Sequence, residues 1–464
     1  MKKLVFIALL TASLLPCVSA KNKETYKITF TVKNSKDSVM YMGFYYANNT
    51  LAFDTAFRNK KDQFIFRGTK EIKTGMYFFS NPQGRYTEFI VGSDKPEYTF
   101  KTDDANWISH MQVSGSPENA DYYEIQNMTR AYYTIIDSII KATPDKNTAR
   151  EKTEPWKKQL DSLTEQYSIN HHDYLIAKMF TARKRVEVPK FNEKGDSLTL
   201  TERAEYYGKH YFDNMALDCN GFVRTPAPIF YDQICRFFDE YLKTATPEVI
   251  CEYADMMIEK SRPAKEVFQY LVHYVTEKYL RSNVMSHDAV YVHMIEKYYA
   301  SGDAFWAKPS DIDAEVQRAS KWKRLLVGET APLFGVFDNE EWHFLNEVKN
   351  KYTLLIFWSP TCGHFATIIP AVYEFYEKNK DKYDIGTFAI NTEIGEIEKW
   401  HKFIEDHHLQ WNNLNGGVAN VDWKNLYDIT TTPVIYLLDK DKKILAKKID
   451  AKMLAEIFKI IEPE

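Results

Sequence analysis

One stretch near the C-terminus constrains the fold of this chain more than any other. Residues 352–358 form an apolar run that is typical of a strand buried on both faces of a sheet. Ser359 and Pro360 end this run, and residues 365–378 then repeat apolar side chains at helical spacing. The sequence therefore predicts a strand and a helix that are joined by a short loop, and this loop contains Cys362.

Cys362 stands where the predicted strand gives way to the predicted helix. Unpaired N–H groups and the helix dipole at such a position favour the thiolate, which is the nucleophilic form of cysteine. Pro370 lies inside the same helix and should kink it. Thr432 and Pro433 precede a second apolar run at 434–438, and the bond between them is a candidate for the cis isomer.

These features resemble the thioredoxin superfamily, in particular its periplasmic or envelope thiol-disulfide oxidoreductases, whose leading segment is related to that of peroxiredoxins. The resemblance covers residues 326–464, and its motifs occur in the family's order: Gly328-Glu329-Thr330-Ala331-Pro332, Trp358, Cys362-Gly363-His364, Pro370 and Thr432-Pro433. It implies an α/β thioredoxin fold in which Cys362 is the attacking cysteine and the Thr432-Pro433 loop holds the substrate backbone. The preceding helical region is similar to that of Bacteroidetes-type multidomain thioredoxin-like proteins.

The sequence departs from the family pattern at one position. The pattern is Cys-Gly-His-Cys, and Phe365 stands where the second, resolving cysteine would be. Three interpretations stay open: Cys362 exchanges with protein or small-molecule thiols and disulfides as a monothiol; it forms long-lived mixed disulfides as a trap or adaptor; or the fold is a redox-inactive protein-binding module. In the last case the groove would be formed by Trp358, His364, Phe365, Thr432 and Pro433. A charged His364 would also lower the pKa of the thiol.

The sequence gives less support for peroxidase activity, a proton relay, or metal and cofactor binding. The peroxidase pattern Pro-x-x-x-Thr-x-x-Cys is absent, because Pro360, Thr361 and Cys362 are contiguous. Glu393, after the predicted strand 385–391, is either a proton relay, as the resemblance suggests, or a solvated loop glutamate. None of the 12 histidines has the spacing of a helical zinc pair, and no phosphate loop or dinucleotide fingerprint occurs, so we expect no metal and no cofactor.

The N-terminus predicts export. Two lysines, an apolar stretch at 4–15 and small residues up to Ala20 form a secretory signal over residues 1–20, cleaved near Ala20. Pro16 directly before Cys17 argues against a lipid anchor at that cysteine. No later segment approaches the ~20 apolar residues of a membrane span. We expect a soluble periplasmic or secreted protein; the net charge of −4 gives no sign of nucleic-acid binding, and the oligomeric state stays open.

At 464 residues the chain should hold more than one core. Short runs rich in aromatic and β-branched residues predict a β-sandwich-like domain over 21–118; the predicted strands are 26–32, 39–46, 64–68, 76–79, 87–91 and 97–102. Helical patterns predict an all-α domain over 119–325, with helix starts at Thr246-Pro247-Glu248 and at Pro263. The predicted fold class is thus multidomain: β-sandwich-like, then all-α, then α/β thioredoxin fold over 326–464.

Three further cysteines and two charged stretches complete the prediction. Cys219, Cys235 and Cys251 are interpreted as small buried hydrophobic residues, with a Cys219–Cys235 or Cys235–Cys251 bridge as the alternative. Residues 141–165 and 186–194 are highly charged, and we expect them to be solvated.

Overall fold

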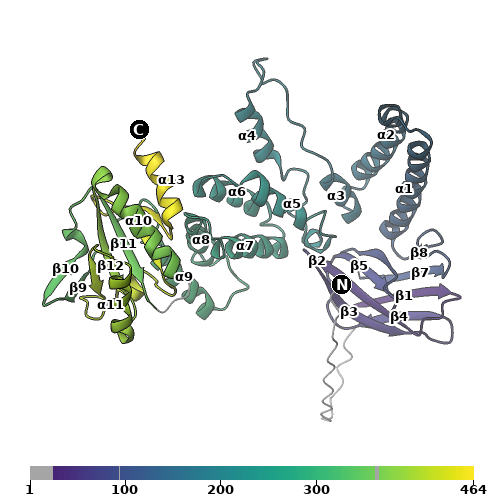
Figure 1. The fold of residues 1–464 in the computed structure, drawn as a ribbon. Coiled ribbons are helices and arrows are strands. Elements are labelled where there is room, and N and C mark those ends of the chain that lie inside the picture. Colours follow the sequence, from purple (N-terminus) through teal and green to yellow (C-terminus); the bar gives the residue numbers. More distant parts are fainter. Residues whose placement is uncertain (1–23, 94, 361–364, 464) are drawn as a thin grey trace, which may run out of the picture. The chain divides into compact units, whose positions relative to one another are not determined.

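The computed structural model describes residues 24–93, 95–360 and 365–463 (Figure 1). The chain divides into two compact units, Met1–Tyr241 and Leu242–Glu464. The predicted fold class is confirmed: a β-rich domain is followed by a helical region and then by an α/β thioredoxin-like domain. The division between the units falls inside the helical region, and the domain boundaries predicted after residues 118 and 325 remain predictions.

The first unit begins with two four-stranded sheets. One has the strand order β4-β1-β7-β8, and the other has the order β3-β2-β5-β6. The strands of the first sheet are β4 (Gln63–Gly68), β1 (Tyr26–Lys33), β7 (Glu97–Asp103) and β8 (Gln112–Ser114). Those of the second are β3 (Asn49–Phe57), β2 (Val39–Tyr46), β5 (Gly75–Ser80) and β6 (Tyr86–Val91). All pairs are antiparallel except β1 with β7.

A cluster of phenylalanines joins the two sheets into a sandwich. Phe79 of β5 stacks on Phe30 of β1 at a ring-centroid distance of 4.3 Å and on Phe89 of β6 at 4.4 Å. Phe66 of β4 and Phe100 of β7 each lie 5.4 Å from the same ring. All five side chains are fully buried. Large aromatic rings in such contact dominate the energetics of a core, so this cluster explains the high phenylalanine content.

Two strands of the sandwich were not predicted. In β3 only Ala56 is buried, so the strand lacks the alternation of apolar and polar residues that marks a half-buried strand. It is held instead by its pairing with β2, through a hairpin in which Tyr46 lies opposite Asn49. β8 is only three residues long, which is too short for a periodic signal.

Five α-helices follow in the first unit. They are α1 (Pro117–Ala142), α2 (Lys146–Asn170), α3 (Leu175–Ala182), α4 (Leu200–His210) and α5 (Tyr231–Arg236). Two shorter helical segments are η1 (Asn220–Arg224) and η2 (Phe237–Tyr241). The Ser116 side chain accepts a hydrogen bond from the Asn119 N–H and caps α1, and Pro117 occupies its first position. The buried Asn119 amide then bonds both the N–H and the carbonyl of Ile90 at 2.7 Å, which fixes α1 to β6.

The second unit also begins with helices. They are α6 (Pro247–Lys260), α7 (Lys265–Leu280), α8 (Asp288–Met294), η3 (Ile295–Tyr299) and α9 (Pro309–Lys323). The start of α6 confirms the prediction, because Thr246 is its N-cap and Pro247 its first residue. α7 begins at Lys265, two residues later than the predicted start at Pro263.

A five-stranded sheet with the order β13-β12-β11-β14-β15 forms the centre of the thioredoxin-like domain. The strands are β11 (Tyr352–Trp358), β12 (Ile385–Asn391), β13 (Asn413–Asn415), β14 (Val434–Asp439) and β15 (Ile444–Lys447). The helices are α10 (Phe365–Tyr383), α11 (Ile397–Asp406), α12 (Trp423–Leu426) and α13 (Ala451–Ile461), with the short turns η4 (Leu345–Glu347) and η5 (Ile394–Glu396). A hairpin of β9 (Gly335–Asp338) and β10 (Glu341–Phe344) precedes them.

The central strand β11 is buried on both faces, as predicted. Leu354 and Ile356 belong to a core cluster that includes Val372 of α10 and Leu454 of α13. The alternate residues Leu355 and Phe357 pack into a second cluster with Phe334, Trp423 and Tyr427. This alternation follows from the pleat of the strand and places helices against both faces of the sheet (Figure 1).

The segment around residues 328–331, before the first strand of the thioredoxin-like region, pairs with the edge of its sheet. Gly328 N–H donates to the Ile444 carbonyl at 2.8 Å, and Ile444 N–H donates to the Glu329 carbonyl at the same distance. Lys447 of β15 is buried and forms an ion pair with Asp288 of α8. The ion pair of Lys447 with Asp288 thus holds helix α8 against the edge strand β15 of the sheet.

None of the helices within the described ranges is long and apolar enough to cross a membrane.

Candidate functional site

The candidate site lies at the end of β11, where the strand leads to Cys362. Trp358 is the last residue of β11 and is fully buried. Its ring packs against Phe403 at 5.5 Å and Trp400 at 6.2 Å, both from α11. Its indole N–H is buried and has no hydrogen-bond partner in the described part of the chain. The predicted binding residue Trp358 is therefore packed into the core at the end of β11.

The loop after β12 is tied to this end of β11. The N–H and the hydroxyl of Thr392 both donate to the Trp358 carbonyl, at 2.9 and 3.2 Å. The side chain of Asn391, which is fully buried, accepts from the Glu393 N–H at 3.0 Å and donates to the Glu393 carbonyl at 3.2 Å. These contacts fix the turn after β12 beside the end of the central strand.

Thr432 and Pro433 lie at the same edge of the sheet. β14 runs antiparallel to β11, and Val434 is paired with Phe357. Pro433, one residue before Val434, is therefore brought beside Trp358, one residue after Phe357. The peptide bond between Thr432 and Pro433 is cis, which confirms the prediction made for it. Both residues are partly exposed and so are accessible at this edge.

Helix α10 begins at Phe365, the position of the missing second cysteine. Pro370 lies inside the helix, as predicted. Cys362 and His364 lie outside the described residues, and so does the side chain of Phe365. Their roles, and the binding roles of Trp358, Thr432 and Pro433, therefore remain predictions.

Glu393 is exposed, on the turn that Asn391 fixes. Its carboxylate is therefore hydrated, whereas the resemblance suggested a buried acid. Its role as a proton relay stays a prediction, and the function proposed below does not depend on it.

The other described cysteines lie away from this loop in sequence: Cys235 is in α5, Cys251 is in α6, and Cys219 directly precedes η1. Cys219, Cys235 and Cys251 form no disulfide with one another and are partly buried. Burial raises the pKa of the Cys251 thiol to about 12, and the negative charges of Asp255 and Glu248 add to this effect. A thiol with such a pKa is almost entirely protonated near neutral pH and is a poor nucleophile.

The sequence did not predict that several apolar residues lie near this site. A row of exposed apolar side chains runs from the turn after β12 towards the β9–β10 hairpin. Ile394 is 52% exposed and lies next to Gly417, and Val418 is 57% exposed. The Val418 carbonyl accepts a hydrogen bond from Phe337 N–H at 2.8 Å, and the Phe337 ring contacts Trp342 at 5.6 Å. Only the fold brings these three segments together.

Several histidines in the described segments pair with acids or rings. His293, for example, bonds Asp255 at 2.9 Å, together with Lys297 and Tyr298. Among the residues that the structure describes, no group of three or more His, Cys, Asp or Glu side chains could hold a metal ion.

Comparison with protein families gives two matches. Residues 350–444 match the model of a family described as thioredoxin-like. Residues 26–122 match the model of a domain of unknown function (DUF4369). No curated protein matches the chain. The first match confirms the resemblance to the thioredoxin superfamily and shows that the C-terminal region has a thioredoxin-like fold.

Several solved structures are similar to parts of the chain. A thioredoxin-like protein from Bacteroides caccae is 20% identical, with a TM-score of 0.48, and the match covers 60% of this chain and 99% of that one. A domain of a possible thiol-disulfide isomerase from Cytophaga hutchinsonii is 36% identical, with a TM-score of 0.28, over 30% of this chain and 93% of that one. The thioredoxin domain of a thiol-disulfide oxidoreductase from Bacteroides vulgatus is 28% identical, with a TM-score of 0.25, over 28% and 96%.

Proposed function

We propose that the C-terminal region catalyses thiol-disulfide exchange through Cys362 alone, as a monothiol. The observation that carries this proposal is the pairing of β11 with β14, in which Phe357 lies opposite Val434. This pairing brings Trp358, the accessible Thr432-Pro433 segment and the chain that leads to Cys362 to one edge of the sheet. The arrangement suits a site where a substrate backbone lies along residues 432–433 with its disulfide next to Cys362.

The first step of the exchange needs only one cysteine. The Cys362 thiolate attacks one sulfur of a client disulfide; the bond between Cys362 and that sulfur forms while the client S–S bond breaks. The departing sulfur leaves as a thiolate and takes a proton from water. Cys362 stands three residues before the first residue of α10, and a helix N-terminus favours the thiolate.

The second step needs a thiol from elsewhere. Phe365 has no sulfur, so the mixed disulfide at Cys362 cannot be resolved from the usual position. Cys251 is the other cysteine of the second compact unit, and its raised pKa makes it a poor resolving nucleophile. We therefore propose an external thiol: in total, the client disulfide gains two electrons and two protons, and two external thiols become one disulfide.

This chemistry suits the location that we propose for the protein. The secretory signal predicted over residues 1–20 lies outside the described residues, and it supports a periplasmic or secreted location after cleavage near Ala20. Disulfides form and persist in such compartments, so both client disulfides and thiols are available there. The proposed partners are therefore protein or small-molecule thiols and disulfides.

A redox-inactive binding module is the second candidate, and one observation favours it. Ile394, Val418, Phe337 and Trp342 are each at least 40% exposed and follow one another along the site. Contiguous exposed apolar side chains are typical of surfaces that bind other proteins. Such a surface would serve an adaptor as well as an exchanger, so only the reactivity of Cys362 separates the two candidates.

The test is the pH dependence of alkylation. The mature protein is treated with iodoacetamide over a range of pH values, and each cysteine is followed by mass spectrometry. We expect Cys362 to react with an apparent pKa well below the ordinary value of about 8.5. Cys251 is an internal control, because its raised pKa predicts slow reaction throughout the neutral range. A Cys362→Ser variant identifies the signal.

An apparent pKa of Cys362 at or above about 8.5 would contradict the proposal and favour the binding module. A second assay follows the chemistry directly. Incubation with a fluorescein-labelled peptide disulfide should label Cys362 covalently, and added glutathione should release the label. No labelling in the Cys362→Ser variant shows that the other cysteines do not contribute.

A further inference from the structure

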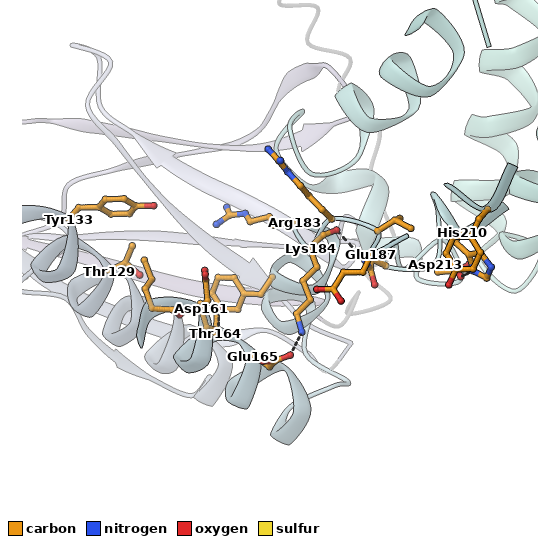
Figure 2. Close-up of a pocket in the computed structure, with 16 residues that line it drawn as sticks. Thr129, Tyr133, Asp161, Thr164, Glu165, Arg183, Lys184, Glu187, His210 and Asp213 are labelled. Atoms are coloured by element: carbon orange, nitrogen blue, oxygen red, sulfur yellow. Dashed lines mark hydrogen bonds and ion pairs between the residues drawn. The ribbon is translucent and has the colours of Figure 1, made fainter. Parts of the chain in front are cut away.

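A large cavity lies in the helical part of the first compact unit, far in sequence from Cys362. Its volume is about 900 Å³, and it opens to solvent (Figure 2). Its walls come from α1, α2, the segment after α3, and α4. The volume lies in the range of ~300–1,000 Å³ that small-molecule sites occupy. Part of the stretch 141–165 predicted to be solvated therefore lines a concave surface.

A smaller cavity of about 350 Å³ continues from the large one. The two share Thr129, Tyr133, Phe180 and Arg183. The remaining walls of the smaller cavity carry five apolar side chains, Met76, Ile125, Ile176, Met179 and Pro226, and four polar or charged ones, Glu88, Tyr122, Gln126 and Arg130. A ligand held at Arg183 could therefore place an apolar group in the smaller cavity.

The larger cavity contains charges of both signs, and some of them pair with one another. Lys184 binds Glu165 at 2.7 Å, as Figure 2 shows, and His210 binds Asp213 at 2.6 Å. These contacts engage Lys184, the imidazole of His210 and two acids, Glu165 and Asp213. They leave four charged groups of the lining to consider.

Arg183, Arg185, Asp161 and Glu187 also line the larger cavity. Their charged groups form no hydrogen bond or ion pair with any residue in the described part of the chain. The one contact of the Arg183 guanidinium is with the face of Phe180, at 5.9 Å. Two guanidinium groups and two carboxylates in the lining of the larger cavity are therefore available to bind a ligand.

This combination of charges selects a class of ligand. A guanidinium binds a carboxylate through two parallel hydrogen bonds, and a carboxylate binds an ammonium group. A simple anion would be repelled by Asp161 and Glu187, and a simple cation by Arg183 and Arg185. A ligand with both a carboxylate and an ammonium group satisfies all four side chains.

We propose that the two cavities bind a short peptide with free termini. The peptide carboxylate lies on Arg183 and Arg185, and its ammonium group on Asp161 and Glu187. The side chain next to the carboxylate enters the smaller cavity, because Arg183 lines both cavities. The site therefore prefers an apolar C-terminal residue. This binding does not depend on the chemistry of Cys362.

The test is calorimetric titration of the full-length mature protein with alanyl-alanyl-phenylalanine. We expect binding that weakens about tenfold when the peptide is N-acetylated and about tenfold when it is C-amidated, since each change removes one charge-assisted contact. Replacing the terminal phenylalanine with serine should weaken binding by a similar factor. The double variant R183A/R185A should bind the free peptide at least tenfold more weakly and be insensitive to amidation.

The matched control is Arg150→Ala, which removes an exposed arginine from α2 outside the lining of either cavity. Its affinity should equal that of the wild type. Circular dichroism checks that each variant folds. The proposal is overturned if the free peptide does not bind in the millimolar range, if acetylation has no effect, or if Arg150→Ala weakens binding as much as the double variant does.

Discussion

We predict that the buried ion pair between Lys447 and Asp288 stabilises the second compact unit. The Lys447 side chain is 6% exposed and the Asp288 side chain 16%. The Lys447 ammonium also donates to the Leu325 carbonyl at 2.5 Å. The change Asp288→Asn keeps the volume of the side chain but removes its charge, so a buried ammonium group is left opposite a neutral amide.

The magnitude follows from this geometry. Removing one partner of a buried ion pair costs about 3–5 kcal/mol. We expect the lower end, about 3 kcal/mol, because Lys447 keeps its bond to the Leu325 carbonyl. The opposite change, Lys447→Met, should cost less, about 1–2 kcal/mol, because Asp288 is more exposed and is the first residue of α8, where the helix dipole favours a negative charge.

Native-state hydrogen exchange measures this cost locally, which matters in a chain with two compact units that need not unfold together. A loss of about 3 kcal/mol should speed the exchange of protected amides in β14 and β15 by about 150-fold. The matched control is Glu374→Gln, in the exposed ion pair with Lys378 on α10, and it should leave these amides unchanged. Acceleration of less than about tenfold in Asp288→Asn, or a larger effect in Lys447→Met, would refute the reasoning.

Three further predictions address the other parts of the chain. Asn119→Ala removes both hydrogen bonds to Ile90 and leaves its buried backbone groups unpaired, so it should cost about 2–3 kcal/mol, seen as faster hydrogen exchange in β6. Phe365→Cys restores the Cys-x-x-Cys spacing, so a labelled peptide disulfide bound at Cys362 should be released without added thiol; equal release by the wild type, followed on non-reducing gels, would contradict monothiol chemistry. Burial lowers the pKa of Lys447 below its ordinary 10.5, with Asp288 opposing this, so the unfolded chain binds more protons at this residue between the two values, and the contribution of Lys447 to the free energy of unfolding rises with pH towards 10.5. Urea titrations should therefore show that the free energy of unfolding of the wild type increases relative to that of Lys447→Met over this pH range.

The sequence predicted several strands and helices of the C-terminal region because their signals are local, whereas β9, β10, β13, α11 and α12 were not predicted. The apolar run 352–358 is β11, and the helix predicted from Phe365 is α10, which continues beyond the predicted end to Tyr383. The cis bond before Pro433 was also predicted, since a proline at the head of an apolar strand restricts the backbone strongly. Each of these features is encoded within about ten residues.

Features that depend on partners distant in sequence were not predicted. β3 has an exposed sequence and is a strand only because β2 pairs with it. The exposed row of Ile394, Val418, Phe337 and Trp342 comes from three segments that meet only in the fold. The paired cavities in the first unit likewise need α1, α2 and α4 together, and their lining residues look like ordinary surface charges in the sequence. Arg183 and Arg185 can be recognised as part of a binding site only when the fold places them in the same cavity as Asp161 and Glu187.

The edge of the thioredoxin-like sheet shows why the second compact unit begins at Leu242, inside the helical region. β15 is the last strand of the sheet, and an uncovered edge strand offers unpaired backbone groups to other chains. Here residues 328–331 pair with that edge, with Gly328 and Ala331 donating to the carbonyls of Ile444 and Lys442. Lys447 looks in the sequence like a solvated lysine that protects an edge, yet it is buried against Asp288. Helix α8 therefore helps to cover the edge strand β15 through Asp288, and β15 in turn pairs with β14, the strand that follows Pro433.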